Sequence, residues 1–236
     1  MSTESREVYS LFVYKPSNSH SDMQGNDTNG YRLNAEYDAY LCGIMIGDGC
    51  LCLYKPKTSG PKYTIDIALN RISDRLFCFG FVLPLLTRFT DKRVRVKDRP
   101  TQGKLEIVVY SKHLFSYMNR KWNFPIGKKK QLMIPEYIVS DDRRLVKTIA
   151  GIFATDGTVV FSKQHKDVPY YPRFEFCSIS EPLLDQLADY FRRKKYHHSR
   201  WKNRLAINGF EGTNRFIKEI GLINPAQLGK WAGNSF

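Results

Sequence analysis

Two related strings in the chain each end in an acidic residue. Residues 41–49 read LCGIMIGDG and residues 149–157 read IAGIFATDG, which places Asp48 and Asp156 at the C-terminal ends of two apolar helices. A helix C-terminus carries partial negative charge, so an acid there is unfavourable by up to about 1 kcal/mol. A second acid beside it adds repulsion or raises one pKa. The repeated pattern therefore predicts a compensating cation. Mg²⁺ fits, because it takes carboxylate oxygens and keeps waters that can act as nucleophiles.

Small residues on the same two helices predict how the acids meet. Gly43 and Gly47 are four residues apart and share one helix face, and Gly151 and Thr155 have the same spacing. Each helical glycine costs roughly 1 kcal/mol relative to alanine, but it lets another backbone approach closely. We expect these faces to form a helix interface that brings both acids together. The alternative for either string is a simple turn after a buried helix.

The residues after the two strings repeat the same order of elements. Each string is followed by a strand, a loop, a strand, a helix, two further strands and a final helix. The pattern predicts an α/β (α+β) fold with two pseudo-symmetric αββαββα repeats and antiparallel sheets. The predicted half-domains span residues 31–124 and 140–236, with a proline-containing and lysine-rich linker at 125–139 and Ser140 capping the next helix. Residues 1–30 are expected to form a flexible arm.

Charge indicates a polyanionic partner. The chain has 37 Lys and Arg against 23 Asp and Glu, a net charge of +14, and its basic clusters occur in both halves beside aromatic residues. No stretch reaches membrane-spanning length and no signal peptide is expected, so an intracellular location, cytoplasmic or nucleoid-associated, is predicted, or an organellar one if an organelle encodes the chain. The five cysteines are interpreted as reduced, mostly buried thiols. A zinc site at Cys50 and Cys52 is the alternative for that pair.

The two strings resemble the signature of the LAGLIDADG homing endonucleases in their single-chain, two-motif form. The resemblance covers residues of about 34 to 232. It includes FPIGKKKQLMIPEYI, which is similar to the linker region of the family, and IGLINPAQLGKW, which is similar to its closing segment. The resemblance implies a monomeric, intron-encoded type of site-specific endodeoxyribonuclease. Such an enzyme makes a double-strand break in a long DNA target with two or three divalent cations, Mg²⁺ or its substitute Mn²⁺.

The resemblance also implies roles for individual residues. Asp48 and Asp156 would be catalytic and would bind metal together with the preceding Gly47 and Thr155. The implied catalytic helpers are Lys128, Arg71, Ser178 and Lys230. The closing segment reads NPAQLGK, where the family commonly has a lysine in place of Ala226 or Gln227. This departure predicts a weaker helper in one half and unequal cleavage of the two strands.

In the family each half contributes an antiparallel sheet to a saddle over the DNA major groove, which is wide enough for two strands. One face of each sheet would pack under helices and the other would meet bases and phosphates. The implied DNA-binding residues are Tyr54, Lys55, Lys57, Lys62, Arg71, Arg93, Arg95, Lys97, Arg99, Ser162, Lys163, Gln164, Arg173, Arg200, Lys202 and Arg204.

Two other functions remain open from the sequence. An intron maturase that binds intron RNA, or a non-cleaving DNA-binding relative, could use the same fold. An architectural nucleic-acid-binding protein would account for the charge alone, but it leaves the duplicated helix-Asp-Gly string unexplained.

Overall fold

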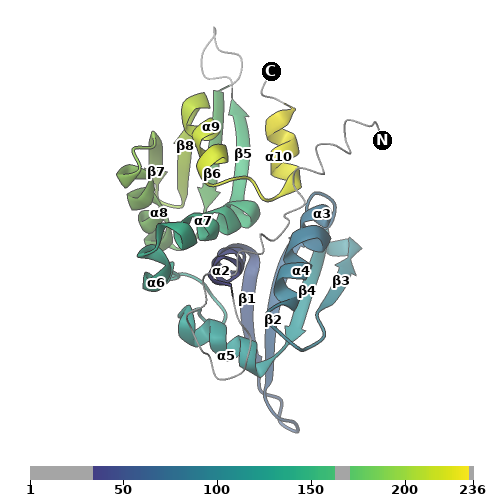
Figure 1. Cartoon of the computed structure of the whole chain (residues 1–236). Helices are drawn as coiled ribbons and strands as arrows, with labels where there is room; N and C mark the ends of the chain where they lie inside the picture. The colour runs from purple at the N-terminus through teal and green to yellow at the C-terminus, as the bar shows by residue number, and fades with distance from the viewer. Residues whose placement is uncertain (1–33, 163–170, 234–236) are drawn as a thin grey trace. The chain divides into compact units, whose positions relative to one another are not determined.

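The computed structural model describes residues 34–162 and 171–233 (Figure 1). The predicted arm at 1–30, together with Lys163 and Gln164, lies outside these residues. The first repeat contains α2 (Ala35–Asp48), β1 (Gly49–Tyr54), β2 (Lys62–Asn70), α3 (Arg75–Phe77), a π-helical turn (Cys78–Val82), α4 (Leu83–Thr87), β3 (Arg95–Arg99), a 3-10 turn (Pro100–Gln102), β4 (Lys104–Tyr110) and α5 (Lys112–Lys121).

The second repeat has the same order of elements. It contains α7 (Asp142–Asp156), β5 (Gly157–Ser162), β6 (Tyr171–Cys177), α8 (Glu181–Arg193), β7 (His198–Trp201), β8 (Arg204–Asn208) and α9 (Gly209–Glu219). A short helix, α6 (Glu136–Val139), precedes this repeat, and α10 (Pro225–Ala232) follows it. The predicted αββαββα order of elements is therefore confirmed in both halves, and α6 and α10 are additional helices.

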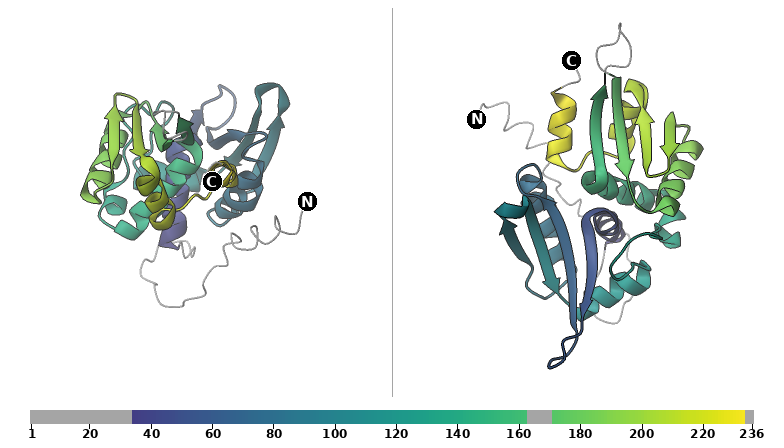
Figure 2. Two further views of the ribbon diagram at one scale, coloured as in Figure 1. Left: turned by 90° about the horizontal axis from the view of Figure 1, so that it is seen from above. Right: turned by 180° about the vertical axis from the view of Figure 1, so that it is seen from behind.

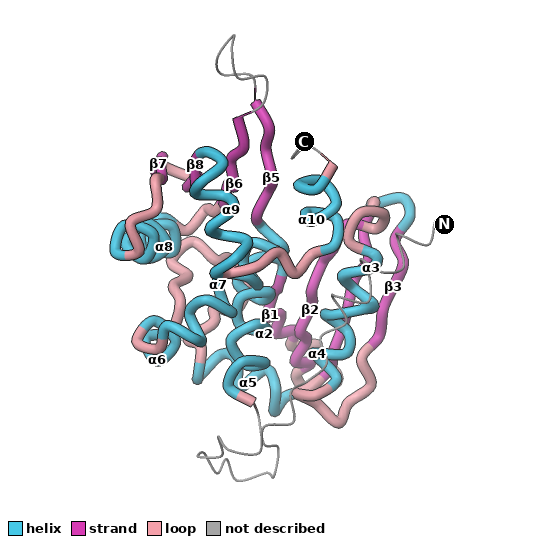
Figure 3. Tube along the Cα trace, turned by 45° about the horizontal axis from the view of Figure 1, so that its top comes forward, coloured by secondary structure: helices cyan, strands magenta, loops and turns pink. Residues whose placement is uncertain are grey.

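The two sheets have the same antiparallel topology. Their strand orders are β1-β2-β4-β3 and β5-β6-β8-β7. Figures 1 and 2 show α2 and α7 lying between the sheets, and Figure 3 distinguishes the helices from the strands by colour. Along β2 and β4 the side chains alternate, so that Ile65, Ile67 and Ile107 are fully buried in the core. The residues that alternate with the buried ones along each strand form the opposite face of the sheet. This face is named the outer face in both sheets.

Side-chain caps begin the two motif helices, and a π-helical turn precedes α4. Asn34 accepts a hydrogen bond from the Glu36 amide at 2.8 Å and begins α2. The predicted cap of the next motif helix was wrong by one residue: Ser140 ends α6, and the Asp141 carboxylate accepts from two amides at the start of α7. An acceptor with two oxygens is well placed to satisfy two amides that have no partner within the helix. The π-helical turn lies just before Pro84, which has no backbone N–H to continue a regular helix.

A buried acid connects the segment between the halves to the start of α2. Asp38 is 4% exposed and accepts hydrogen bonds from the hydroxyl groups of Tyr117, at 2.6 Å, and Tyr137, at 2.7 Å. The Trp122 ring nitrogen donates to the same carboxylate at 3.3 Å. Three donors compensate for the burial of one charge. This network fixes α5 and α6 on the first motif helix.

None of the helices in the described part is long and apolar enough to cross a membrane. All five cysteines are free, as predicted, but only Cys42 and Cys78 are buried. Cys50 and Cys52 face the same side of β1, with their sulfur atoms 3.4 Å apart. No group of three or more His, Cys, Asp or Glu side chains that could hold a metal occurs among the described residues.

Candidate metal centre and nucleic-acid interface

The two motif helices touch through their glycines. A Cβ atom built on Gly151 would lie 2.7 Å from the Tyr40 carbonyl oxygen and 3.0 Å from the Gly43 Cα atom. Contacts this short are incompatible with a side chain, because the neighbouring atoms belong to the backbone of a packed helix. Thr148 adds a hydrogen bond from its hydroxyl to the Ala39 carbonyl at 3.0 Å. The predicted helix interface therefore forms at Gly43 and Gly151.

The second pair of small residues brings the helix ends together. A Cβ atom built on Gly47 would clash with the Thr155 side chain and lie 3.4 Å from the Asp156 amide nitrogen. The Thr155 hydroxyl donates back into its own helix, to Gly151 O at 3.0 Å. α2 ends at Asp48 and α7 ends at Asp156, so the two acids are neighbours at matching helix ends.

The surroundings of the two carboxyl groups favour their neutral forms. Burial, followed by the negative charge of Asp156 and of Asp74, raises the pKa of Asp48 to about 7, against an ordinary value of 3.8. Burial likewise raises the pKa of Asp156 to about 6. The positive charge of Lys129 opposes both increases. Two acids whose pKa values lie this high form a site that a divalent cation would stabilise in the charged state.

Lys129 occupies the end of the first motif helix. Its ammonium group donates to the Ile46 carbonyl at 2.8 Å and also to the Gly47 carbonyl. Burial lowers the pKa of Lys129, while the negative charges of Asp156 and Asp48 act in the opposite direction. A cation at a helix C-terminus offsets the partial charge of the last carbonyls. The lysine therefore supplies part of the compensation that the two acids require.

The lysine at the acids is thus Lys129, whereas the sequence indicated Lys128, which is exposed. The backbone before the lysines sets this register. Gly127 has a φ of 84° and its amide donates to the Leu51 carbonyl at 3.0 Å. A left-handed residue attached to β1 turns the chain so that the second lysine after it reaches α2. Three consecutive lysines carry no signal that distinguishes them, so the sequence alone could not identify the buried one.

Neutral amides occupy the end of the second motif helix. The Gln227 amide nitrogen donates to Phe153 O at 2.6 Å and to Gly157 O at 2.9 Å. The Asn224 amide nitrogen donates to Ala154 O at 2.9 Å. Both residues come from the closing segment, in which the sequence analysis noted the missing lysine. Lys230 is an exposed residue of α10. The two helix ends therefore differ in charge: a lysine caps α2, and amides cap α7.

A pocket of about 320 Å³ opens beside Asp156 and Gly47. Ser178, one of the predicted helpers, lines it together with Asp156 and Lys129. Arg71 has a different partner: its side chain forms an ion pair with Asp98 at 2.6 Å. The donors around the acids are two carboxylates and the carbonyl oxygen of Gly47. This oxygen-rich set fits a hard cation such as Mg²⁺, which binds through one or two carboxylates and keeps several waters.

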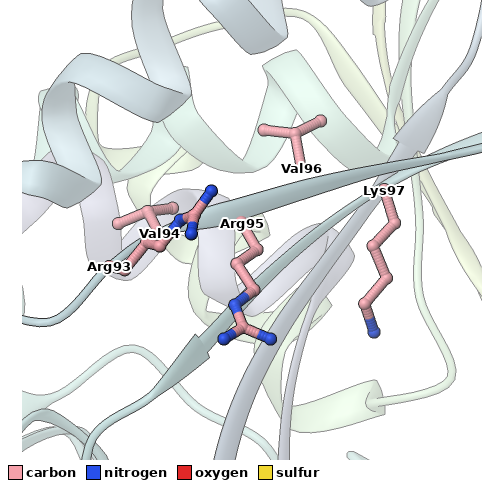
Figure 4. A pocket seen from close by; sticks show the side chains of 5 residues that line it. All are labelled: Arg93, Val94, Arg95, Val96 and Lys97. Atoms are coloured by element: carbon pink, nitrogen blue, oxygen red, sulfur yellow. The ribbon is translucent and has the colours of Figure 1, made fainter.

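The outer face of the first sheet carries basic side chains in alternate positions. Arg95, Lys97 and Arg99 pair with β4 residues on this face, and Lys97 and Arg99 flank Glu106 at 3.6 and 3.4 Å. Figure 4 shows Arg95 and Lys97 pointing to the same side of β3 and Val96 to the other. Together with Arg93 these residues line a pocket of about 570 Å³. The sequence-predicted residues Tyr54, Lys55, Lys57 and Lys62 are also exposed, on β1, β2 and the loop between them.

The second sheet divides its predicted residues between two faces. Arg173 and Arg204 contact the buried Glu175 from the outer face at 3.3 and 3.2 Å. Ser162 is on β5, and Lys202 is exposed in the turn between β7 and β8. Arg200 instead pairs with Asp185 of α8 at 3.0 Å and donates to the Glu181 carbonyl. This places Arg200 on the helix side of the sheet, away from the other basic residues.

Solved structures with a similar fold are LAGLIDADG homing endonucleases. I-DmoI in complex with DNA and Mn aligns with a TM-score of 0.59 and 18% identity, covering 79% of this chain and 97% of that one. I-AabMI bound to uncleaved DNA aligns with a TM-score of 0.54 and 12% identity over 86% and 90% of the two chains. I-LtrWI bound to its target DNA gives 0.53 and 13% over 84% and 88%.

No protein-family model and no curated protein sequence matches the chain. At these identities the structural likeness establishes the fold, and the repeated topology of the two sheets agrees with it. The chain therefore has the LAGLIDADG fold, with both repeats in one polypeptide.

Proposed function

We propose that this chain is a site-specific endodeoxyribonuclease that cuts both strands of a long DNA target with a divalent cation. The observation that carries the proposal is the pair Asp48 and Asp156 at the ends of touching helices, with the pKa of each carboxyl group raised. A fold maintains such unfavourable electrostatics where a bound cation offsets them. The DNA complexes of structures with the same fold support the choice of substrate.

The proposed mechanism assigns separate tasks to the residues. Asp48 and Asp156 would hold Mg²⁺ with the Gly47 carbonyl and bound waters. When bound, Mg²⁺ lowers the pKa of water and stabilises charge on phosphate oxygens. Lys129 is close enough to both acids to neutralise part of their charge and to attract the phosphate. Ser178, in the same pocket, could orient a water by hydrogen bonding.

The two strands are expected to react at different rates. Lys129 provides a positive charge at the end of α2, whereas Gln227 and Asn224 provide neutral dipoles at the end of α7. Developing negative charge on a phosphate is stabilised more by a nearby cation than by an amide. We infer that the strand handled nearer Lys129 is cut first, so that a nicked duplex accumulates.

The basic outer faces would bind the DNA backbone. Arg95, Lys97 and Arg99 on the first sheet and Arg173 and Arg204 on the second are the proposed contacts. Glu106 and Glu175 hold several of these side chains in position and limit their mobility before binding. Such preorganisation reduces the entropy lost on association.

The test begins with selection of a target from a plasmid library with a randomised insert. The selected duplex is then incubated with the natural chain in Mg²⁺ or in Ca²⁺, and binding and cleavage are measured separately. We expect binding in both ions and double-strand cleavage in Mg²⁺. Specific binding without cleavage in Mg²⁺ or Mn²⁺ would instead favour a non-cleaving relative. Preferential binding of structured intron RNA over any DNA would favour a maturase.

A further inference from the structure

The most exposed large apolar residues of the two halves occupy matching turns. Ile72 is 82% exposed and Ile179 is 68% exposed. Each stands two residues after the end of a strand, β2 or β6, and each is followed by serine and then an acid. A single exposed isoleucine requires no explanation. Two at equivalent positions of repeats that otherwise differ in sequence indicate a shared use.

The other exposed apolar side chains of the two repeats are not at matching positions. Leu76 stands four residues after Ile72 and is 56% exposed, but Leu183, at the same distance from Ile179, is 1% exposed. The remaining exposed apolar side chains in the described part of the second half, Trp201 and Phe210, lie on β7 and α9. The turn isoleucine is therefore the exposed apolar feature that both halves have in common.

Both turns are held rigidly. In the first, the Ile72 amide donates to the Asn70 side chain at 2.9 Å, and the Asn70 amide donates to Asp74 at 2.9 Å. In the second, the Ser180 amide donates to the Ser178 hydroxyl at 3.1 Å, and the Ser180 hydroxyl donates to the Leu132 carbonyl at 2.6 Å. Backbone atoms fixed on both sides of an exposed isoleucine hold its side chain outward without a further ordering cost on binding.

Both turns also lie at the carboxylate pair. Ile179 lines the same pocket as Asp156 and Lys129. In the first turn, Asp74 accepts a hydrogen bond from Asn224 of the closing segment. The Asn224 amide nitrogen, at 2.9 Å from each oxygen, connects Asp74 to the Ala154 carbonyl near the end of α7. Ile179 therefore borders the pocket of the proposed cleavage centre, and the turn that carries Ile72 is bonded to the end of α7.

The location of the two turns near the acids indicates which part of the DNA the isoleucines would contact. Two acids on touching helix ends can serve phosphates of opposite strands most directly across the minor groove, which is about 6 Å wide against about 12 Å for the major groove. Apolar side chains that enter the minor groove act as wedges between base steps, unstacking them and bending the duplex. Steps of the TA and CA/TG type deform most easily.

We propose that Ile72 and Ile179 are specificity-determining wedges that insert into the DNA minor groove between the two cut phosphates. The inference rests on the proposed endonuclease function. Through these wedges the chain would discriminate among base pairs at the centre of its target by their deformability. The central positions should then favour flexible pyrimidine–purine steps, and both isoleucines should contribute.

The test uses the selected target with 2-aminopurine, a base whose fluorescence rises on unstacking, placed between the two cut positions. Binding is measured in Ca²⁺ for the natural chain, Ile72→Ala, Ile179→Ala and the double variant. Leu76→Ala is the matched control, because it removes an exposed apolar side chain that has no counterpart in the other half. Thermal unfolding confirms that all variants are equally folded.

We expect fluorescence to rise with the natural chain and with Leu76→Ala, to rise less with either isoleucine variant, and to stay near the free-duplex value with the double variant. Selectivity among central base steps, read from cleavage of a library randomised only there, should fall roughly tenfold in the double variant, with outer positions unaffected. A natural chain that cuts without raising the fluorescence would overturn the wedge and leave the nuclease intact. A double variant with the same fluorescence rise and the same selectivity as the natural chain would also overturn the wedge and leave the nuclease intact. A natural chain that neither binds nor cuts would overturn the nuclease, and the wedge with it.

Discussion

The folded state is destabilised when Asp48 and Asp156 both carry negative charge and Lys129 is the nearby cation. Their environment favours protonation because burial removes water and each acid repels the other. The donors present at this point are the Lys129 ammonium group and the Gln227 amide, which bond to the helix carbonyls and offset only part of the charge. The site is therefore less stable when metal-free than a pair of ordinary turn residues would be.

The raised pKa values predict a stability that falls with increasing pH in EDTA. The folded chain keeps protons on Asp48 up to about pH 7, whereas the unfolded chain loses them near the ordinary value of 3.8. The folded state thus binds more protons within this window, so its unfolding free energy declines as the pH rises through it. We expect a loss on the order of 2 kcal/mol between pH 5 and 8, measured by urea denaturation. Asp48→Asn should flatten the curve. An equally steep decline in that variant would show that other groups cause it.

Lys129 and Lys128 provide a matched pair for the cleavage centre. Lys129→Met removes the cation that donates to the helix carbonyls and whose charge acts on both acids. We expect it to slow cutting of one strand by roughly 100-fold, a loss typical of one charge-stabilising donor. Lys128→Met, at an exposed neighbour, should change the rate less than about twofold at moderate salt.

Strand-resolved rates on an end-labelled duplex measure both variants. Gln227→Lys should accelerate the slower strand of the natural chain, because it introduces the missing charge at the end of α7. A larger defect for Lys128→Met than for Lys129→Met would assign the catalytic role to the exposed lysine instead.

The close packing of the two motif helices determines the positions of the acids at their ends. Gly43 and Gly151 allow backbone contact along α2 and α7, and Gly47 allows the Thr155 side chain to lie against the end of α2. The helix ends are consequently aligned, and the acids with them. Asp38 fixes the other end of α2 to α5 and α6. The segment that carries Lys129 is therefore attached to α2 at both ends of the helix.

Gly151→Ala tests the close approach. The new methyl group would meet the Tyr40 carbonyl and the Ile44 amide, which belong to the helix backbone and cannot move independently. We expect a loss of about 1–3 kcal/mol of unfolding free energy, measured by urea denaturation. Gly80→Ala is the control, since a Cβ there meets nothing within 4 Å in a helical segment. It should be neutral or stabilising by up to about 1 kcal/mol. Equal effects of the two substitutions would argue against a tight helix interface.

Across the whole molecule, we expect the basic residues on the outer faces of the sheets to make the backbone contacts in the proposed DNA complex. Arg95 is exposed on the outer face of the first sheet, whereas Arg200 is paired with Asp185 on the helix side of the second. Each phosphate contact adds close to one unit to the slope of log affinity against log salt. The two arginines should therefore contribute differently to binding, although both lie in basic stretches of the sequence.

Arg95→Gln should weaken binding to all duplexes and reduce the salt slope by about 1. Arg200→Gln should leave the slope unchanged, because its charge faces α8. Fluorescence anisotropy between low and moderate salt, in Ca²⁺, measures both. A reduced slope for Arg200→Gln, comparable with that for Arg95→Gln, would place Arg200 at the DNA.

The sequence predicted the features that depend on repetition and periodicity. The duplicated string predicted the helix pair, and alternating apolar residues predicted the strands and their buried faces. It did not identify Lys129, because that choice depends on the left-handed Gly127 and its bond to β1. It did not place Arg200 either, because a four-residue strand beside a basic run gives no clear alternation. Contacts between distant segments decided both positions.

We propose above that Asp48 and Asp156 form one metal-dependent centre for cutting DNA. The most direct measurement follows both labelled strands of the selected target in Mg²⁺, with the natural chain, Asp48→Asn and Asp156→Asn, and measures binding in parallel. We expect cleavage of both strands by the natural chain and loss of double-strand cutting in each variant, with affinity retained. Double-strand cleavage that persists at the natural rate in either variant would contradict it.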